Sequence, residues 1–215
     1  DFLVDADDVQ LYASGSLSGL TSENPQLDTR STFDINSTGG LISGTLSLQG
    51  AWQDSLHHEL STRLEAFDVR QWTNRARFQS SISGLVTASG MTVGQNDVLS
   101  HVEGRFNDVT WINRAADSIS VSLDLTPESL SGNVSLSNGN GLIASQGSLS
   151  LDGTRSLQST TRLDLVDVGP LLGRSEMQSR ISAEITAEAS LYWDQRFTAS
   201  IDVGVEDSYL RIAEG

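Results

Sequence analysis

The sequence predicts an all-β protein: an elongated, curved and mainly antiparallel sheet whose apolar face forms a taco-like groove. The 215 residues are rich in Ser, Thr, Gly, Leu, Val and Asp, which favours strands and turns over helices. Apolar and polar residues alternate with a period of two over long stretches, as in strands with one face in water. A unit of about 100 residues also occurs twice, and such a repeat lengthens a sheet without changing its cross-section.

Alternating runs and turn sequences place the strands. One clear run has its apolar residues at Ile119, Val121, Leu123 and Leu125. Two more runs follow at 181–191 and 197–205. Ser37–Gly40 and Asn138–Gly141 contain Gly or Asn residues, which tolerate positive φ and so predict hairpins between strands. We expect an antiparallel meander of roughly five or six strands in each repeat unit.

One interruption of the strands is predicted at "GPLLG", Gly169–Gly173. Pro170 suits the first turn of a short helix. Trp72 holds the position in the first copy that Leu171 holds in the second. We therefore expect a short element that packs an apolar side chain against one end of the sheet.

The repeat defines the expected organisation of the chain. Residues 62–90 and 161–189 are identical at 12 of 29 positions without a gap. We expect one unit at 1–99, a second at 100–198 and the first strand of another at 199–215, with one groove running through them. Because the chain starts at Asp1 and holds no apolar run long enough for a membrane anchor, we expect it to be a piece of a longer protein.

Charge and composition exclude several classes of protein. The formal net charge is −15, and all 13 basic residues are Arg. Nucleic-acid binding needs a basic stripe, and none is visible. There is no cysteine, so neither disulfides nor thiolate metal sites are expected.

No catalytic or metal-binding constellation stands out, so we expect neither an enzyme nor a cofactor. His57, His58 and His101 are interpreted as surface or loop residues, because the sequence around the first two lacks the second half of a zinc-protease motif. Asp5–Asp8 could bind calcium, but the Gly and the distal Glu of a calcium loop are absent at the required spacing.

Two recurrent features have structural interpretations. Asp68 and Asp167 occupy equivalent positions in the repeat, and each is expected to cap a following short helix by accepting backbone N–H bonds. The tryptophans could stack on sugars, although packing at strand ends is the favoured interpretation. They are Trp52, Trp72, Trp111 and Trp193.

Three stretches resemble the AsmA-like superfamily: "STRLEAFDVRQW" from Ser61, "SSISGLVTASG" from Ser80 and "TTRLDLVDVGPLLGRSEMQSRISAEITAEAS" from Thr160. In both copies a strand ending in L-x-x-x-D-V precedes a short turn and an alternating strand of small and apolar residues. The resemblance implies a taco-shaped β-sheet with an apolar interior. It also implies that the protein spans the bacterial periplasm from an inner-membrane anchor outside this chain. It also implies phospholipid transport towards the outer membrane, help in assembling outer-membrane proteins, and an outer-membrane barrel partner bound by a terminus outside this chain.

The apolar face carries the functional hypothesis. Phospholipid acyl chains would lie along it, at ~0.8 kcal/mol per buried CH₂ group. The residues expected to line the groove are Val121, Leu123, Val134, Leu136, Leu149, Leu151, Ile181, Ile185, Ile201 and Val203. Two alternatives stay open: a chaperone or scaffold that takes up an unfolded strand by β-augmentation, and a closed structural or adhesin repeat with a sandwich core. We also expect the chain to self-associate through its sheet edges.

Overall fold

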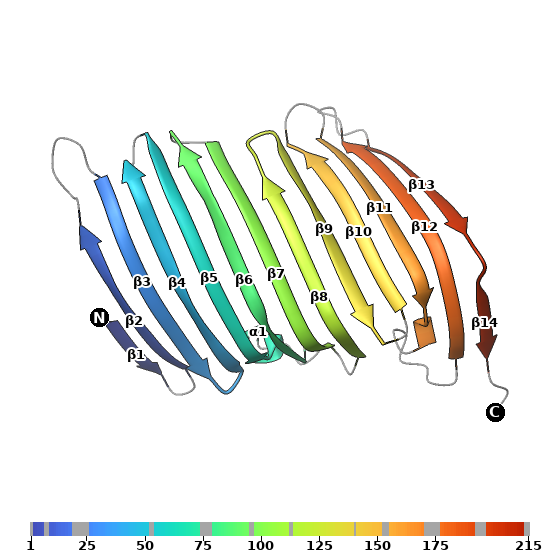
Figure 1. Cartoon of the computed structure of the whole chain (residues 1–215), viewed down its shortest axis with the longest axis horizontal. Helices are drawn as coiled ribbons and strands as arrows, with labels where there is room; N and C mark the ends of the chain where they lie inside the picture. Colours follow the sequence, from blue (N-terminus) through green and yellow to red (C-terminus); the bar gives the residue numbers. More distant parts are fainter. Residues whose placement is uncertain are drawn as a thin grey trace.

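The computed structural model is one open, curled sheet of 14 strands that follow one another along the chain (Figure 1). It describes residues 2–6, 9–18, 26–51, 54–73, 79–94, 97–111, 114–139, 141–151, 155–169, 177–191 and 197–212. The all-β, elongated and antiparallel fold that the sequence predicts is confirmed.

The strands β1 to β13 pair in sequence order, each antiparallel to the next, and β14 pairs with β12 beyond the end of β13. The elements are β1 (Phe2–Ala6), β2 (Val9–Ser18), β3 (Gln26–Ser37), β4 (Gly40–Ala51), β5 (Ser55–Phe67), α1 (Val69–Thr73), β6 (Ser80–Val93), β7 (Asp97–Trp111), β8 (Arg114–Leu125), β9 (Ser129–Asn138), β10 (Gly141–Ser150), β11 (Arg155–Val166), β12 (Met177–Leu191), β13 (Phe197–Val205) and β14 (Tyr209–Ile212).

Both predicted hairpins are confirmed. Ser37 lies opposite Gly40 at the β3–β4 turn, and Asn138 lies opposite Gly141 at the β9–β10 turn. Gly40 has a φ of 108°, which residues other than glycine rarely adopt. The Ser37 hydroxyl accepts a hydrogen bond from the Gly39 N–H (3.0 Å), which steadies the tight turn.

Three strands bulge near the end of the sheet at which α1 lies. Ala66, Asp108 and Leu165 have positive φ values of 50°, 52° and 54°. The pairing register shifts beside each of them, in β5–β6, β6–β7 and β11–β12. Such bulges bend a strand and increase its local twist, so they contribute to the curl of the sheet.

After the bulges in β5 and β11, an Asp carboxylate accepts hydrogen bonds from the backbone of the segment that leads to the next strand. Asp68 Oδ1 accepts hydrogen bonds from the Arg70 N–H (3.0 Å) and the Ser80 N–H (3.0 Å). The first of these caps α1, as the sequence predicts. Asp167 Oδ1 accepts the same pair of bonds, from the N–H groups of Gly169 and Ser179 (both 3.1 Å).

The sheet runs without a break through both predicted unit boundaries. Residues 99 and 100 lie inside β7, and residues 198 and 199 lie inside β13. The division into repeat units therefore stays a prediction. The rest of the expected plug, from Pro170 to Gly173, lies outside the described residues, as does the side chain of Trp72.

The chain forms a single layer with little core. It exposes 14233 Å² of surface, whereas a compact monomer of this mass would expose about 9,700 Å². Among the described residues, the buried apolar side chains are Val109, Ala116, Val166, Met177 and Ala183. Most of these lie close to the end of the sheet that carries α1, and nearly all other side chains of the described strands are half-buried or exposed.

Candidate functional site

One face of the sheet, here called the apolar face, is built from four rows of residues that cross the strands from β3 to β13. Residues directly opposite each other in antiparallel strands point to the same side, so the register defines each row. The first row contains Ile35, Ile42, Leu64, Gly84, Phe106, Ile119, Leu136, Ile143, Leu163, Ala183 and Val205. The second row contains Phe33, Gly44, Thr62, Val86, Gly104, Val121, Val134, Ser145, Thr161, Ile185 and Val203.

The other two rows lie further from α1. The third row contains Ser31, Leu46, Leu60, Ala88, Val102, Leu123, Gly132, Gly147, Ser159, Ala187 and Ile201. The fourth row contains Thr29, Leu48, His58, Gly90, Ser100, Leu125, Leu130, Leu149, Leu157, Ala189 and Ala199. Neighbouring rows are two residues, about 6.7 Å, apart along each strand.

Small residues form a floor between two ridges in strands β9 to β11. In these strands the first and fourth rows hold only Leu and Ile, whereas the third row holds Gly132, Gly147 and Ser159. Gly132 and Gly147 lie directly opposite each other. The row of small residues runs across these strands, along the long axis of the sheet.

Aromatic rings cover other glycines of the same face. A Cβ atom added at Gly44 would lie 2.6 Å from Phe33 Cζ, and one added at Gly104 would lie 2.9 Å from Phe106 Cε2. The Phe33 ring therefore lies against Gly44 of the neighbouring strand, whereas the Phe106 ring lies against Gly104 of its own strand, β7. Glycine provides the room for this close approach, and the ring shields the backbone in return.

The structure brings together nine of the ten residues that the sequence predicts to line the face. Eight of them belong to the four rows, and Ile181 lies two positions before Ala183 in the unbroken strand β12. Leu151 lies just past the end of β10, where its N–H donates to Glu128 O (2.7 Å). The sequence-based set omitted the matching positions of β3 to β7, such as Leu46 and Leu60, although the same alternation marks them.

None of these ten side chains is buried. Val134 is 42% exposed, Val203 59% and Ile201 69%. The others are half-buried except Leu151, which is 40% exposed. Because no second layer of the described residues covers them, the apolar face is an open surface and not the core of a sandwich.

In the described strands β3 to β13, charged residues lie on the opposite face, here called the polar face, and at the strand ends. No Asp, Glu, Lys or Arg occurs in the four rows of β3 to β13. The polar face carries ion pairs such as Arg162–Glu184 (2.8 Å) and Arg63–Glu65 (2.9 Å). At these exposed positions an ion pair adds little stability, and the charges serve mainly to keep that face in water.

All three histidines lie in strands and not in loops: His57 and His58 belong to β5 and His101 to β7. The alternative interpretation as surface residues fits His57, which is exposed, and His58 and His101, which are half-exposed. The ring of His101 contacts Asp124 Oδ1 (2.7 Å) and Glu103 Oε1 (3.4 Å) on the polar face. The hydrogen bond to the Asp124 carboxylate, and then that to Glu103, raises the pKa of His101.

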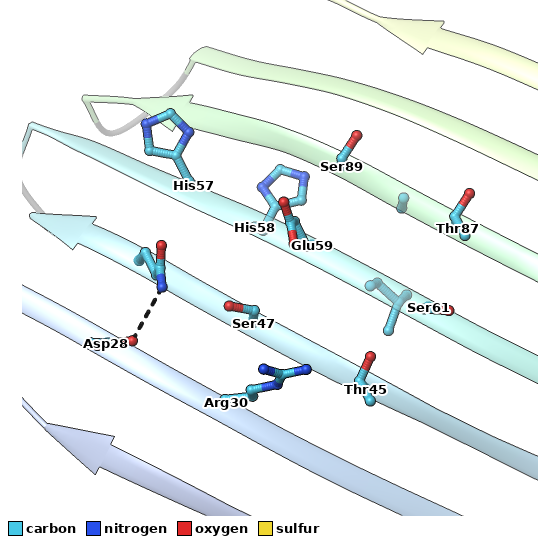
Figure 2. A pocket seen from close by; sticks show the side chains of 13 residues that line it. Asp28, Arg30, Thr45, Ser47, His57, His58, Glu59, Ser61, Thr87 and Ser89 are labelled. Carbon is cyan, nitrogen blue, oxygen red and sulfur yellow. Dashed lines mark hydrogen bonds between the residues drawn. The ribbon is translucent and has the colours of Figure 1, made fainter.

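The polar face also contains a hollow over β3 to β6, which Figure 2 shows from close by. It is lined by Asp28, Arg30, Thr45, Ser47, Gln49, His57, Glu59, Ser61, Thr87 and Ser89 of the polar face, and also by His58, Leu60 and Ala88, which belong to the rows of the apolar face. Gln49 Nε2 donates to Asp28 Oδ1 (3.4 Å) across it. These hydroxyl, amide and charged groups suit water, so this hollow would not hold hydrocarbon.

The described residues offer little support for other chemistry. They contain no group of three or more His, Cys, Asp or Glu residues placed to hold a metal ion. Their helices include none long and apolar enough to cross a membrane. Two of the four candidate calcium residues, Asp7 and Asp8, lie outside the described part of the chain, as do the side chains of the four tryptophans.

Comparison with known proteins identifies no relative of this chain. No protein-family model, no curated protein and no solved structure matches the chain.

Proposed function

We propose that the apolar face is a track for lipid acyl chains, and that the chain is a segment of a conduit that carries phospholipid between two membranes. The observation that carries this proposal is that the rows of the apolar face are not covered by any second layer of the described residues. Rows of mostly apolar residues continue across eleven strands without an Asp, Glu, Lys or Arg among them, and nearly all of their side chains are half-buried or exposed. In a soluble monomer a contiguous apolar surface of this kind is unusual and marks a binding surface.

The dimensions of the face fit hydrocarbon chains. Eleven strands at about 4.8 Å spacing extend about 48 Å. One leaflet of a bilayer is about 15 Å of hydrocarbon, half of the ~30 Å core. Several acyl chains could therefore lie end to end along the floor. Each buried CH₂ contributes about 0.8 kcal/mol, and the uniform lining gives no single position a large advantage over the next, which suits sliding.

The cellular location of this conduit is proposed from the sequence resemblance. Its sequence motifs resemble those of the AsmA-like superfamily, and we propose that the chain is a fragment of a protein like the translocation and assembly module protein TamB. We propose accordingly that it lies in the bacterial periplasm, held by an inner-membrane anchor outside this chain. A partner barrel in the outer membrane would bind a terminus outside this chain.

Native mass spectrometry of the purified chain tests the proposed function, because it reports bound lipid and oligomeric state together. We expect phospholipid to copurify and to be removed by the paired change Leu136→Gln and Leu149→Gln. The matched control changes Ser135→Gln and Ser148→Gln on the polar face should leave it bound. Lipid-free protein that also fails to take up added phospholipid would contradict the proposal.

A second candidate function, the capture of an unfolded strand, is favoured by β13. Among the described strands, β13 pairs only with β12, and its side chains are all exposed. Such an edge can take up another strand by backbone hydrogen bonding, from a client protein or from a second copy of this chain. Hydrogen exchange distinguishes the two candidates: strand capture would slow exchange of the β13 backbone amides, whereas lipid on the apolar face would leave the exchange of these edge amides unchanged.

A further inference from the structure

The fourth row of the apolar face is interrupted by polar groups at β5 to β7. From β8 to β11 this row is an unbroken ridge of Leu side chains. At β5, β6 and β7 it consists of His58, Gly90 and Ser100. His58 is the one ionisable side chain in the four rows of the described strands β3 to β13.

His58 and Ser100 meet across the strand between them. His58 Nε2 lies 3.2 Å from Ser100 Oγ, although the two residues belong to β5 and β7. A Cβ atom added at Gly90 would lie 2.9 Å from His58 Nε2. The imidazole therefore reaches over Gly90, and any larger residue there would block the contact.

The pair keeps further capacity for hydrogen bonding. Imidazole has two ring nitrogens, and a hydroxyl group can donate one bond and accept two. Within the described part of the chain, the bond between Nε2 and Oγ is the one hydrogen bond that either side chain makes. Both side chains are half-exposed, so these groups can present an N–H or O–H donor to a molecule on the face.

The pair also lies near the rim of the face. Ser100 is three residues from the start of β7, and His58 is three residues from the start of β5. A molecule whose hydrocarbon lay along the floor could thus place its polar end between His58 and Ser100 while its head group stayed in water. Leucine side chains, which fill the fourth row from β8 to β11, could not donate a hydrogen bond to an oxygen atom at this position.

We propose that His58 and Ser100 form a polar station on the apolar face, which binds an acceptor oxygen at the polar end of an acyl-chain amphiphile. The inference rests on the proposed function, because it needs hydrocarbon on the same face. The acceptor oxygen is an ester carbonyl or a phosphate oxygen. The pair gives the face a position where a lipid pauses in a defined orientation.

The test uses three probes that share one chain length and are kept below their micelle-forming concentrations. They are a lysophospholipid with an ester linkage, its ether-linked analogue and the methyl ester of the fatty acid. Each displaces an environment-sensitive apolar dye from the chain. Binding of the dye itself reports the apolar face, and displacement reports affinity for the probe. The variants are His58→Phe, which keeps a ring over Gly90, and Ser100→Ala. The controls, His57→Phe and Ser89→Ala, lie on the polar face.

Both station variants should bind the dye as the wild type does and lose about three- to tenfold in affinity for the probes that carry the recognised oxygen. Loss for the two esters but not for the ether analogue assigns the ester carbonyl, and loss for the two phospholipids assigns the phosphate. Unchanged affinity for all three probes, with the dye still bound, would overturn the station and leave the proposed function standing. A wild-type chain that binds neither dye nor probe would overturn the proposed function itself.

Discussion

Ile185 on β12 lies directly opposite Val203 on β13, and Val203 is 59% exposed. Two large aliphatic side chains thus stand together on one side of the sheet with water above them. In a β-sandwich this pair would be covered by a second sheet about 10 Å away. The pair is therefore assembled as part of a sheet but is not covered by the described residues.

The first prediction separates the open face from the small core. Ile201→Asp should lower the free energy of unfolding by about 1 kcal/mol, because a carboxylate on the 69% exposed position stays hydrated and only strand propensity is lost. Val166→Asp should cost more than about 3 kcal/mol, because Val166 is 1% exposed and the charge would be buried without a partner. Urea denaturation of both variants measures the difference. Equal, large losses at the two positions would mean that the apolar face is covered in solution.

The second prediction concerns the ring of Phe106 over Gly104. Phe106→Ala should destabilise the sheet by about 2 kcal/mol, roughly half of the usual cost in a full core, because the ring is half-buried. Gly104→Ala should also destabilise the wild type, since its Cβ would lie 2.9 Å from Phe106 Cε2. In the Phe106→Ala background the same change should be neutral or stabilising, because only the ring stands in its way. Additive losses in this double-mutant cycle would show that the ring does not rest on Gly104.

The third prediction is an acid-range effect of Asp68. Partial burial opposes ionisation, but the N–H groups of Ser80 and Arg70 and the Arg70 guanidinium together lower the pKa of Asp68 below 3.8. Because the folded pKa is the lower one, the ionised carboxylate stabilises the fold fully above pH 3.8, and this contribution is lost as the pH falls through the folded pKa. Urea midpoints of wild type and Asp68→Asn should therefore differ most at neutral pH and converge in acid. A constant difference at every pH would contradict the effect.

The fourth prediction has the opposite sign and concerns His101. The carboxylates of Asp124 and Glu103 raise its pKa above 6.5. The stabilisation from the protonated ring is thus complete below pH 6.5 and lost as the pH rises through the folded pKa. An NMR titration of the ring protons should give a higher midpoint for His101 than for the same residue in Asp124→Asn. Identical midpoints in the two proteins would show that the ring and the carboxylate do not interact in solution.

The strands and the choice of face could be predicted from the sequence because both depend on local pattern. Alternation along a run such as Ile119 to Leu125 determines which side chains share a side of the strand, and the Gly-containing turns determine where the chain reverses. Every hairpin then pairs neighbours in sequence, so a meander needs no long-range information.

The contact between His58 and Ser100 could not be predicted in the same way. The two residues are 42 positions apart and belong to strands that are not neighbours. Their meeting depends on the accumulated register of β5, β6 and β7. The bulges could not be predicted from the sequence either, because Ala66 and Leu165 adopt a left-handed conformation that neither residue type favours. A glycine in mid-strand, such as Gly90, is the sequence signal that could have directed attention to this close approach.

Photo-crosslinking from Val121 tests the central claim most directly. Val121 lies in the second row of the apolar face, opposite Val134, whereas the next residue, Ser122, points to the polar face. A photoreactive amino acid is placed at either position, and the protein is irradiated in cells or with phospholipid vesicles. The account predicts lipid adducts from position 121 and few from position 122. Equal yields from the two positions, or none from position 121 in a folded protein, would contradict the claim that the apolar face carries lipid.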